Sequence, residues 1–166
     1  MSLKEKIKNN LAMALKGKKE IEASTLRMLL AAILNKEKEK RYKLSKEKPE
    51  LKEEELEKGS ELTDEEVIEV VSSEVKKRKE AILEFEKGER LDLVEKEKKE
   101  LEILEKYLPE QLSEGEIKKI AKEIIEKVGA QNLKDIGKVM AELMPQVKGR
   151  AEGAVVSKIV KELLTP

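Results

Sequence analysis

The chain has 166 residues, and 36 Lys and Arg balance 36 Asp and Glu, so its formal net charge is zero. A zero net charge excludes binding of nucleic acid through bulk charge alone, so any basic site must be local. The chain has no Cys and no His, which excludes a disulfide framework and removes the commonest general base and metal ligand. Charged residues make up 43% and aromatic residues only 2%, a composition that predicts an all-α protein.

The first third of the chain predicts two helices followed by a charged segment. Ser2 and Glu5 form a capping-box pattern, a helical apolar repeat follows, and Gly17 is expected to end this helix. A second helix is predicted from about residue 19 to 34. Residues 35–60 carry almost no apolar stripe, so they could form a solvated helical extension, a mobile loop, or a combination of the two.

The middle of the chain predicts two longer helices. Thr63 with Glu66 is a second capping box, and the helix that it begins should be interrupted at Gly88. The next helix should end at Leu108–Pro109, because proline disfavours the helical conformation in the preceding residue. The composition also changes there, toward less charge. We therefore predict an N-terminal helical domain over residues 1–108 and a small C-terminal domain over 109–166.

Three short helices are predicted in the C-terminal domain. Ser113 with Glu116 is a third capping box, and Asn132 is expected to cap the second helix, which should end at Met144–Pro145. The last helix carries an apolar stripe over residues 155–164. Each helix is too short to be stable alone, so their apolar faces must pack on each other.

No apolar run approaches the ~20 residues of a membrane span, and residues 1–11 lack the apolar core of a signal peptide. We therefore expect a cytoplasmic protein without a membrane partner. The Cys-free composition rich in Lys and Glu fits a thermophile, although a mesophilic helical protein remains the alternative.

The sequence offers few candidates for catalysis. A nucleophile would have to be Ser, Thr or Lys, and Ser72 and Ser73 lie in mid-helix, where serines usually face solvent or bond back to a carbonyl. The acids are spaced as solvent-facing helix residues, and the glycines match neither a phosphate loop nor a dinucleotide fingerprint. We therefore predict no catalytic residue, no metal site and no cofactor.

Arg78 lies on the apolar stripe of the helix that begins near Thr63. One interpretation, which we favour, is a partly buried guanidinium paired to an acid such as Glu74, with its stem packed on the core. The other interpretation is a site for an anion or a partner protein.

The helical pattern breaks near the end of the chain, at PQVKGRAEG, residues 145–153. Gly149 permits a positive φ, and Gly153 permits close approach of another backbone or a phosphate. Lys148 and Arg150 lie on this predicted turn. The alternative interpretation, a tight turn with solubilising cations, is the one that charge patterning alone favours.

Two further lysines extend this basic segment. Lys158 and Lys161 should lie on the face of the last helix opposite its Val/Ile stripe. The exposed amides at the start of that helix would add a favourable dipole for an anion.

Three blocks of the sequence resemble the YqeY-like proteins, and together they span nearly the whole chain. The blocks are LRMLLAAI at 26–33, EVKKRKEAILEFEKGERLDLVEKEKKELEILEKYLPEQLSEGEI at 74–117, and GKVMAELMPQVKGRAEGAVVSKIVKELL at 137–164. The last block is similar to the C-terminal tail of GatB, the B subunit of tRNA-dependent amidotransferases. Glu152 departs from the Asp or Asn that commonly follows the Gly-Arg-Ala, and glutamate is a poor helix cap.

The resemblance implies two all-helical parts, with a three-helix tail domain of the GatB/YqeY type. In amidotransferases that tail is associated with holding tRNA, and a similar module begins some glutaminyl-tRNA synthetases. YqeY-like proteins are often described as carbon–nitrogen ligases with glutamine as amido-N-donor, a description that belongs with the shared tail. Nothing in this chain resembles the amidase signature or a kinase-type ATP site.

These observations lead us to expect a non-catalytic tRNA-binding or tRNA-associated accessory protein. The predicted RNA-binding residues are Lys148, Arg150 and Lys158, and residues 35–60 should contribute less. The partner would be tRNA or another structured RNA, with an amidotransferase or a tRNA synthetase as candidate protein partner and no DNA. The alternatives are an amidotransferase-linked protein, either an accessory to that enzyme or a weak amidotransferase itself, and a helical protein–protein interaction module.

Overall fold

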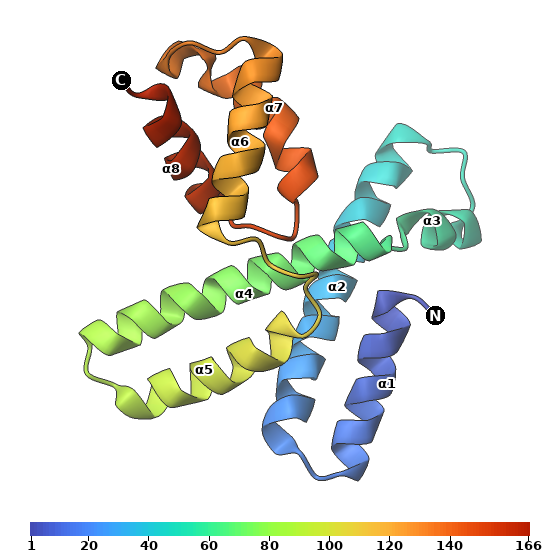
Figure 1. Ribbon diagram of the computed structural model, residues 1–166. Coiled ribbons are helices and arrows are strands. Elements are labelled where there is room, and N and C mark those ends of the chain that lie inside the picture. Colours follow the sequence, from blue (N-terminus) through green and yellow to red (C-terminus); the bar gives the residue numbers. More distant parts are fainter. The chain divides into compact units, whose positions relative to one another are not determined.

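The computed structural model describes residues 1–166 and contains eight α-helices, one short 3-10 helix and no β-strand (Figure 1), which confirms the all-α prediction. The helices form two compact units, Met1–Tyr107 and Leu108–Pro166. Independent folding of domains 1–108 and 109–166 stays a prediction. None of the helices has both the length and the apolar character needed to span a bilayer.

The N-terminal unit consists of two helical hairpins and a short helix. Its helices are α1 (Leu3–Lys16), α2 (Glu20–Glu47), α3 (Glu53–Ser60), α4 (Asp64–Lys87) and α5 (Leu91–Glu105). Figure 1 shows α1 beside the first half of α2 and α4 beside α5, and α3 packs on α2. Because α2 also contacts α4 and α5, this one long helix joins the two hairpins.

Both hairpins begin and turn as local chemistry dictates. The hydroxyls of Ser2 and Thr63 accept hydrogen bonds from the third-residue amides of α1 and α4, so both predicted capping boxes are confirmed. The helices end at Gly17 and Gly88, also as predicted. In each turn the residue after the glycine has a positive φ of 54°, although it is Lys18 in one turn and Glu89 in the other.

Helix α2 runs 13 residues beyond its predicted end at Leu34, through most of the charged segment. Ion pairs hold this extension to two other helices: Glu37 pairs with Lys4 of α1 at 2.5 Å, and Lys40 pairs with Glu66 of α4 at 2.7 Å. Helix α3 occupies the end of the same segment, so the structure selects the helical extension and leaves only residues 48–52 as a connection.

Arg78 is the central charge between α4 and α5. Its side chain is 11% exposed, and its Nε lies 2.9 Å from a carboxylate oxygen of Glu100 and 3.3 Å from one of Glu97. The predicted partner, Glu74, was wrong: it accepts a hydrogen bond from Lys77 at 2.6 Å. The favoured interpretation of a partly buried guanidinium paired to an acid is otherwise confirmed, with Glu97 and Glu100 as the acids.

Helix α5 ends earlier than predicted, at Glu105 rather than at Leu108–Pro109. Tyr107 donates its backbone N–H to Leu104 at 3.0 Å and is buried, with its hydroxyl accepting a hydrogen bond from Asn10 of α1 at 2.8 Å. Because the Tyr107 ring is buried, the chain leaves the helical conformation before it reaches Pro109.

The tail unit contains α6 (Glu114–Val128), the 3-10 helix η1 (Leu133–Asp135), α7 (Ile136–Val147) and α8 (Gly153–Leu164). Ser113 and Glu116 form the predicted capping box of α6. The Asn132 side chain accepts from the amide of Lys134 at 2.9 Å, so it caps η1, which leads directly into α7. The apolar faces of the three helices form one buried cluster: Ile117, Ala121, Ile124, Val139, Leu143, Val147, Val156, Ile159, Val160 and Leu164.

The predicted end of α7 at Met144–Pro145 was wrong, because Pro145 lies inside the helix, which continues to Val147. A proline removes only one backbone donor, and here it does so in the last turn. Val147 is fully buried in the tail core, and its burial favours continuing the helix over stopping it.

Candidate functional site

The α7–α8 turn, residues 148–152, has a backbone that is defined by local hydrogen bonds. The amides of Arg150 and Ala151 both donate to the carbonyl of Val147, at 2.9 and 3.1 Å. Gly149 has a φ of 73°, as its place in the predicted turn allows. The turn is therefore compact and presents residue 148 at the surface.

Contacts with the segment that precedes α6 fasten this turn in place. The Arg150 carbonyl accepts from the amide of Leu112 at 2.8 Å, and the Gly149 carbonyl accepts from the Gln111 side chain at 2.8 Å. The Arg150 Nε in turn donates to the carbonyl of Glu110 at 3.2 Å. No sequence signal indicated these bonds, which join residues about 40 positions apart in the chain.

Of the three predicted RNA-binding residues, the structure places two on the turn and one on α8. Lys148 is exposed, and Arg150 is half-buried. Arg150 thus differs from expectation, because part of its guanidinium supports the fold. Lys158 is exposed on α8, five positions after the helix begins.

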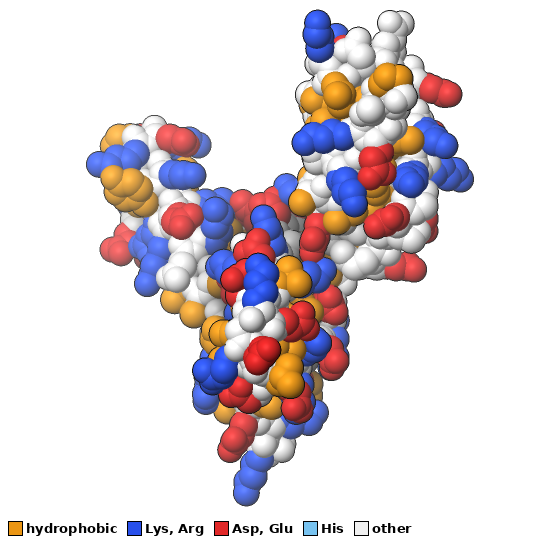
Figure 2. Space-filling model, turned by 90° about the vertical axis from the view of Figure 1, so that its left-hand side faces the viewer, with side chains coloured by type: hydrophobic (Ala, Val, Ile, Leu, Met, Phe, Trp, Pro, Cys, Tyr) orange, Lys and Arg blue, Asp and Glu red, His pale blue; other side chains and the backbone are white.

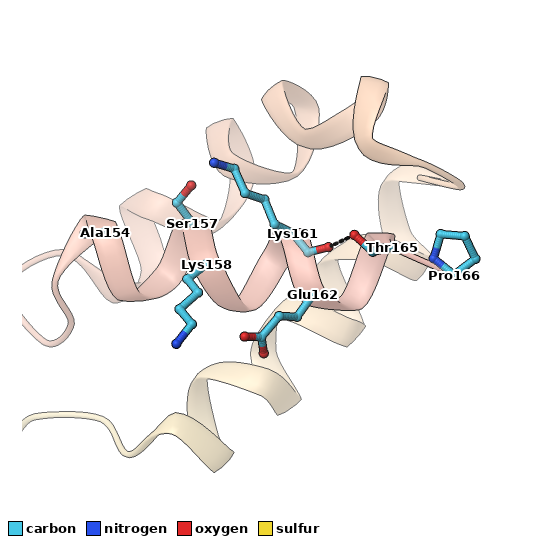
Figure 3. Close-up of a pocket in the computed structure, with 7 residues that line it drawn as sticks. All are labelled: Ala154, Ser157, Lys158, Lys161, Glu162, Thr165 and Pro166. Carbon is cyan, nitrogen blue, oxygen red and sulfur yellow. Dashed lines mark hydrogen bonds between the residues drawn. The ribbon is translucent and has the colours of Figure 1, made fainter.

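The outer face of α8 carries a shallow groove (Figure 3), lined by Ala154, Ser157, Lys158, Lys161, Glu162, Thr165 and Pro166. The side chains of Lys158 and Lys161 point in different directions from the helix, and the Glu162 carboxylate lies on the Lys158 side. Thr165 donates its hydroxyl to the Lys161 carbonyl at 2.7 Å and so closes the C-terminal end of α8. Both lysines face away from the buried stripe, as the sequence predicted.

The charges of the tail are balanced in number but mostly unpaired in space. The tail has ten Lys and Arg and nine Asp and Glu, and Figure 2 shows both signs intermixed over the face in view. Lys127 pairs with Glu142 at 2.9 Å. The lysines in no ion pair are Lys118, Lys119, Lys122, Lys134, Lys138, Lys158 and Lys161.

One carboxylate next to the turn has a shifted pKa. Hydrogen bonds from the backbone N–H and the hydroxyl of Ser113 lower the pKa of Glu116 below its ordinary 4.5, and the charge of Arg150 adds a smaller lowering. Arg150 therefore acts electrostatically on the start of α6 as well as bonding to the Glu110 carbonyl.

Helix α8 begins without a side-chain cap. Glu152 occupies the N-cap position with extended backbone angles of −74° and 133°, but its carboxylate accepts no hydrogen bond from the first turn. This agrees with the expectation that glutamate caps poorly at this position.

The catalytic candidates lie elsewhere, in the N-terminal unit. Ser72 is half-buried, and Ser73 lines an open groove between α2 and α4 together with Glu69, Glu74 and Lys77. Glu74 is already hydrogen-bonded to Lys77. The structure forms no group of three or more acidic side chains that could hold a metal ion.

These features define a class: an all-helical protein in two units, with a small three-helix tail whose last inter-helical turn is basic and fastened by Arg150. The chain belongs to the YqeY-like family, whose profile matches residues 47–164. The match includes α3 to α8 and therefore both units. The predicted family resemblance is confirmed.

Two relatives extend this comparison to fungi. The chain is 34% identical over 112 residues to "Uncharacterized protein C22F3.15" of Schizosaccharomyces pombe, an alignment that covers 68% of this chain and 76% of the relative. It is 32% identical over 105 residues to "Altered inheritance of mitochondria protein 41, mitochondrial" of Pyrenophora tritici-repentis, which covers 61% of this chain and 58% of that protein. The match thus spans little more than half the length of the second relative.

Proposed function

We propose that this protein is a non-catalytic, tRNA-associated accessory protein whose tail unit contacts the RNA. The observation that carries the proposal is the exposed pair Lys158 and Lys161 on the outer face of α8, where neither forms an ion pair. A lysine without a carboxylate partner can neutralise a phosphate directly, whereas a lysine in an ion pair must first leave its carboxylate. The similarity of the last block to the GatB tail supports RNA as the polyanion.

Each predicted contact residue has a distinct role in this proposal. Lys148 and Lys158 contact phosphates directly from exposed positions, and Lys161 extends the contact along α8. Arg150 contributes its charge and also fixes the turn through the Glu110 carbonyl. A protein partner of the amidotransferase or tRNA synthetase class fits the same proposal, because both classes bring a similar tail to tRNA.

The test is binding of unmodified tRNA by the full chain over a series of salt concentrations. For a duplex polyanion, log affinity falls with log salt at a slope of about −0.9 per neutralised phosphate. Replacing Lys158 and Lys161 by Gln should weaken binding and flatten the slope by roughly 1 to 2 units. The matched control is Lys87→Gln with Lys99→Gln, which removes two exposed charges that already pair with Glu84 and Glu95 at 2.7 Å.

Arg150 needs a separate comparison because of its structural bond. Arg150→Lys keeps the charge but loses the bond from Nε, whereas Arg150→Gln loses both. Binding that survives Arg150→Lys and weakens in Arg150→Gln, with unchanged helical content, would identify a charge contact. An unchanged slope in the Lys158/Lys161 double variant would overturn the tail as the contact surface.

The compartment that we propose is the cytoplasm. The relative from Pyrenophora tritici-repentis carries a mitochondrial name, so the alternative compartment is the mitochondrion. Imaging of a tagged full-length chain distinguishes the two, and a mitochondrial signal would redirect the tRNA test to organellar tRNA.

A further inference from the structure

The distal half of α2, residues 36–47, carries an aromatic ring exposed to solvent. Tyr42 is 65% exposed, whereas the other tyrosine, Tyr107, is 8% exposed and hydrogen-bonded. The chain has only three aromatic residues in all. A single exposed ring is ordinary on a protein surface, so its surroundings decide whether it has a role.

The α2 residues around the ring are basic although the whole chain is neutral, and the neighbouring acidic turn of α3 is represented in the groove beside the ring by Glu53, which pairs with Arg41. Residues 36–48 contain seven Lys and Arg and three Glu. Two of the three acids are already paired, since Glu37 bonds to Lys4 and Glu39 lies 3.2 Å from Lys36. The third, Glu47, is five positions from Tyr42 and so about 140° around the helix.

Two lysines flank the ring on the same side of the helix. Lys38 and Lys46 are four positions before and after Tyr42, so all three side chains share one face. The Lys46 Nζ lies 5.4 Å from the centre of the Tyr42 ring, within the range of a cation–π interaction. Neither lysine forms an ion pair. We name Lys38, Tyr42 and Lys46 the outer face of α2.

Inward contacts fix the rotation of α2 and therefore the direction of this face. Glu37 and Lys40 bond toward α1 and α4, and Leu44 packs so closely on α3 that a Cβ at Gly59 would lie 2.8 Å from it. Arg41 is held by Glu53 of α3 at 3.0 Å, at the edge of a shallow groove that Lys38 and Tyr42 also line. The outer face is thus presented by a restrained helix.

A structural explanation accounts for only part of this arrangement. Lysines in the last turn of a helix interact favourably with its dipole, which explains Lys46. It explains neither Lys38, two turns earlier, nor the exposed ring between the two cations. An aromatic ring with cations on both sides is the arrangement by which proteins bind single-stranded nucleic acid: bases stack on the ring, and phosphates meet the cations.

We propose that the outer face of α2 binds a single-stranded RNA segment. One unpaired base stacks on Tyr42, and the phosphates on its two sides lie against Lys38 and Lys46. We expected residues 35–60 to contribute less to RNA binding than the tail does. For the outer face of α2, the present proposal replaces that expectation. The proposal adds a second RNA contact and does not require the one proposed for the tail.

The test uses the full chain and a fluorescein-labelled 12-mer of uridylate, which forms no duplex, with binding measured by anisotropy. Tyr42→Ala should weaken binding about tenfold, because the base loses its stacking surface, while the salt slope stays unchanged. Tyr42→Phe keeps the ring and should bind within about twofold of the natural chain. Lys38→Gln with Lys46→Gln should flatten the slope by about 1.4 units, two single-strand phosphates at ~0.7 each.

A second readout reports the stacking directly. The chain has no Trp, so tyrosine emission is visible, and in a Tyr107→Phe background Tyr42 is its only source. Oligouridylate should quench this emission at the concentrations at which anisotropy rises. Because the Tyr42 side chain is exposed, its variants should retain the circular dichroism of the natural chain, which excludes misfolding as the cause of lost binding.

The remaining outcomes separate this proposal from its competitors. Equal binding by Tyr42→Ala and Tyr42→Phe would overturn it, as would tight binding of poly-glutamate or anionic vesicles with none of oligouridylate. The Lys158/Lys161 double variant should bind oligouridylate like the natural chain. If that variant loses tRNA while Tyr42-dependent binding of oligouridylate persists, both contacts hold. If it loses tRNA while Tyr42→Ala binds oligouridylate as the natural chain does, the α2 proposal is overturned and the tail proposal stands.

Discussion

The two units hold their helices together by different forces. In the N-terminal unit, three ion pairs with side chains mostly withdrawn from solvent link α1 to α2, α2 to α4 and α4 to α5: Lys4–Glu37, Lys40–Glu66 and Arg78–Glu100. In the tail, every buried residue is apolar, and the ion pair that joins α6 to α7, Lys127–Glu142, is exposed.

Apolar contacts and buried ion pairs therefore specify different features of the fold. Apolar burial is non-directional and is sufficient to bring three short helices together. A charge taken out of water is costly unless a particular partner meets it, so buried pairs select which helices lie side by side. We therefore interpret the charges of the N-terminal unit as determinants of helix pairing more than as sources of net stability.

The largest expected effect comes from a cavity in the tail. Leu143 is fully buried, and Leu143→Ala should lower the free energy of unfolding of the tail by about 4 kcal/mol, because transfer and cavity losses add. Chemical denaturation followed by circular dichroism should show the tail melting early while the α1–α5 signal persists. The control is Leu133→Ala, at a leucine that is 47% exposed, with an expected change below about 0.5 kcal/mol. A single cooperative transition for both units would contradict the interpretation that the tail unfolds separately from the N-terminal unit.

The next effect tests the charges of the N-terminal unit. Arg78→Met should cost about 3 kcal/mol, because the largely buried carboxylates of Glu97 and Glu100 would lose their closest counter-charge, and the exposed Lys96 reaches only Glu100, at 3.9 Å. The triple variant Arg78→Met, Glu97→Gln, Glu100→Gln should recover most of this loss in the same denaturation experiment. A single variant as stable as the natural chain would mean that water already screens these groups.

A smaller effect is expected at the start of α6. Ser113→Ala removes the capping hydroxyl and should cost about 1 kcal/mol. Because the folded-state pKa of Glu116 is lowered, its stabilising contribution is present above the ordinary value of 4.5 and is lost as the pH falls through the folded value. Ser113→Ala should move this pKa part of the way toward 4.5 in an NMR titration, because the hydroxyl bond is lost while the backbone N–H of residue 113 still donates. A pKa unmoved by the change would assign the shift to that backbone bond and the charge of Arg150.

The smallest effect concerns the uncapped helix. Glu152 has the extended backbone of an N-cap but no capping bond, so Glu152→Asp should stabilise the tail by about 0.5 kcal/mol. Thermal denaturation of the two chains side by side measures this gain. A lower stability of the Glu152→Asp variant would show that the glutamate side chain makes a contact that stabilises the tail more than an aspartate cap does.

Local chemistry made much of the fold predictable. Three capping boxes, the stops at Gly17 and Gly88, and the apolar stripes of α4, α6 and α8 all follow from neighbours within a few residues. The misses required partners far along the chain. Helix α2 extends beyond its apolar stripe because ion pairs hold the extension to α1 and α4. Helix α7 continues beyond Pro145 because the core buries Val147.

The candidate site shows the same limit. The sequence correctly indicated a compact turn with Lys148 exposed and Lys158 opposite the buried stripe. It gave no sign that Arg150 bonds to the Glu110 carbonyl, because that bond depends on how the start of α6 meets the turn. The exposure of Tyr42 was equally hidden, since it follows from the inward bonds of its neighbours on α2.

The turns of the two N-terminal hairpins leave room for improvement by evolution or by design. Lys18 and Glu89 adopt a left-handed backbone that costs a residue with a Cβ about 1 kcal/mol, and glycine would adopt it freely. Neither residue belongs to the tail or to the outer face of α2. Glycine at these two positions should therefore raise the stability of the fold without touching either contact surface. A chain stabilised in this way would stay folded with destabilising substitutions at its contact surfaces that would unfold the natural chain.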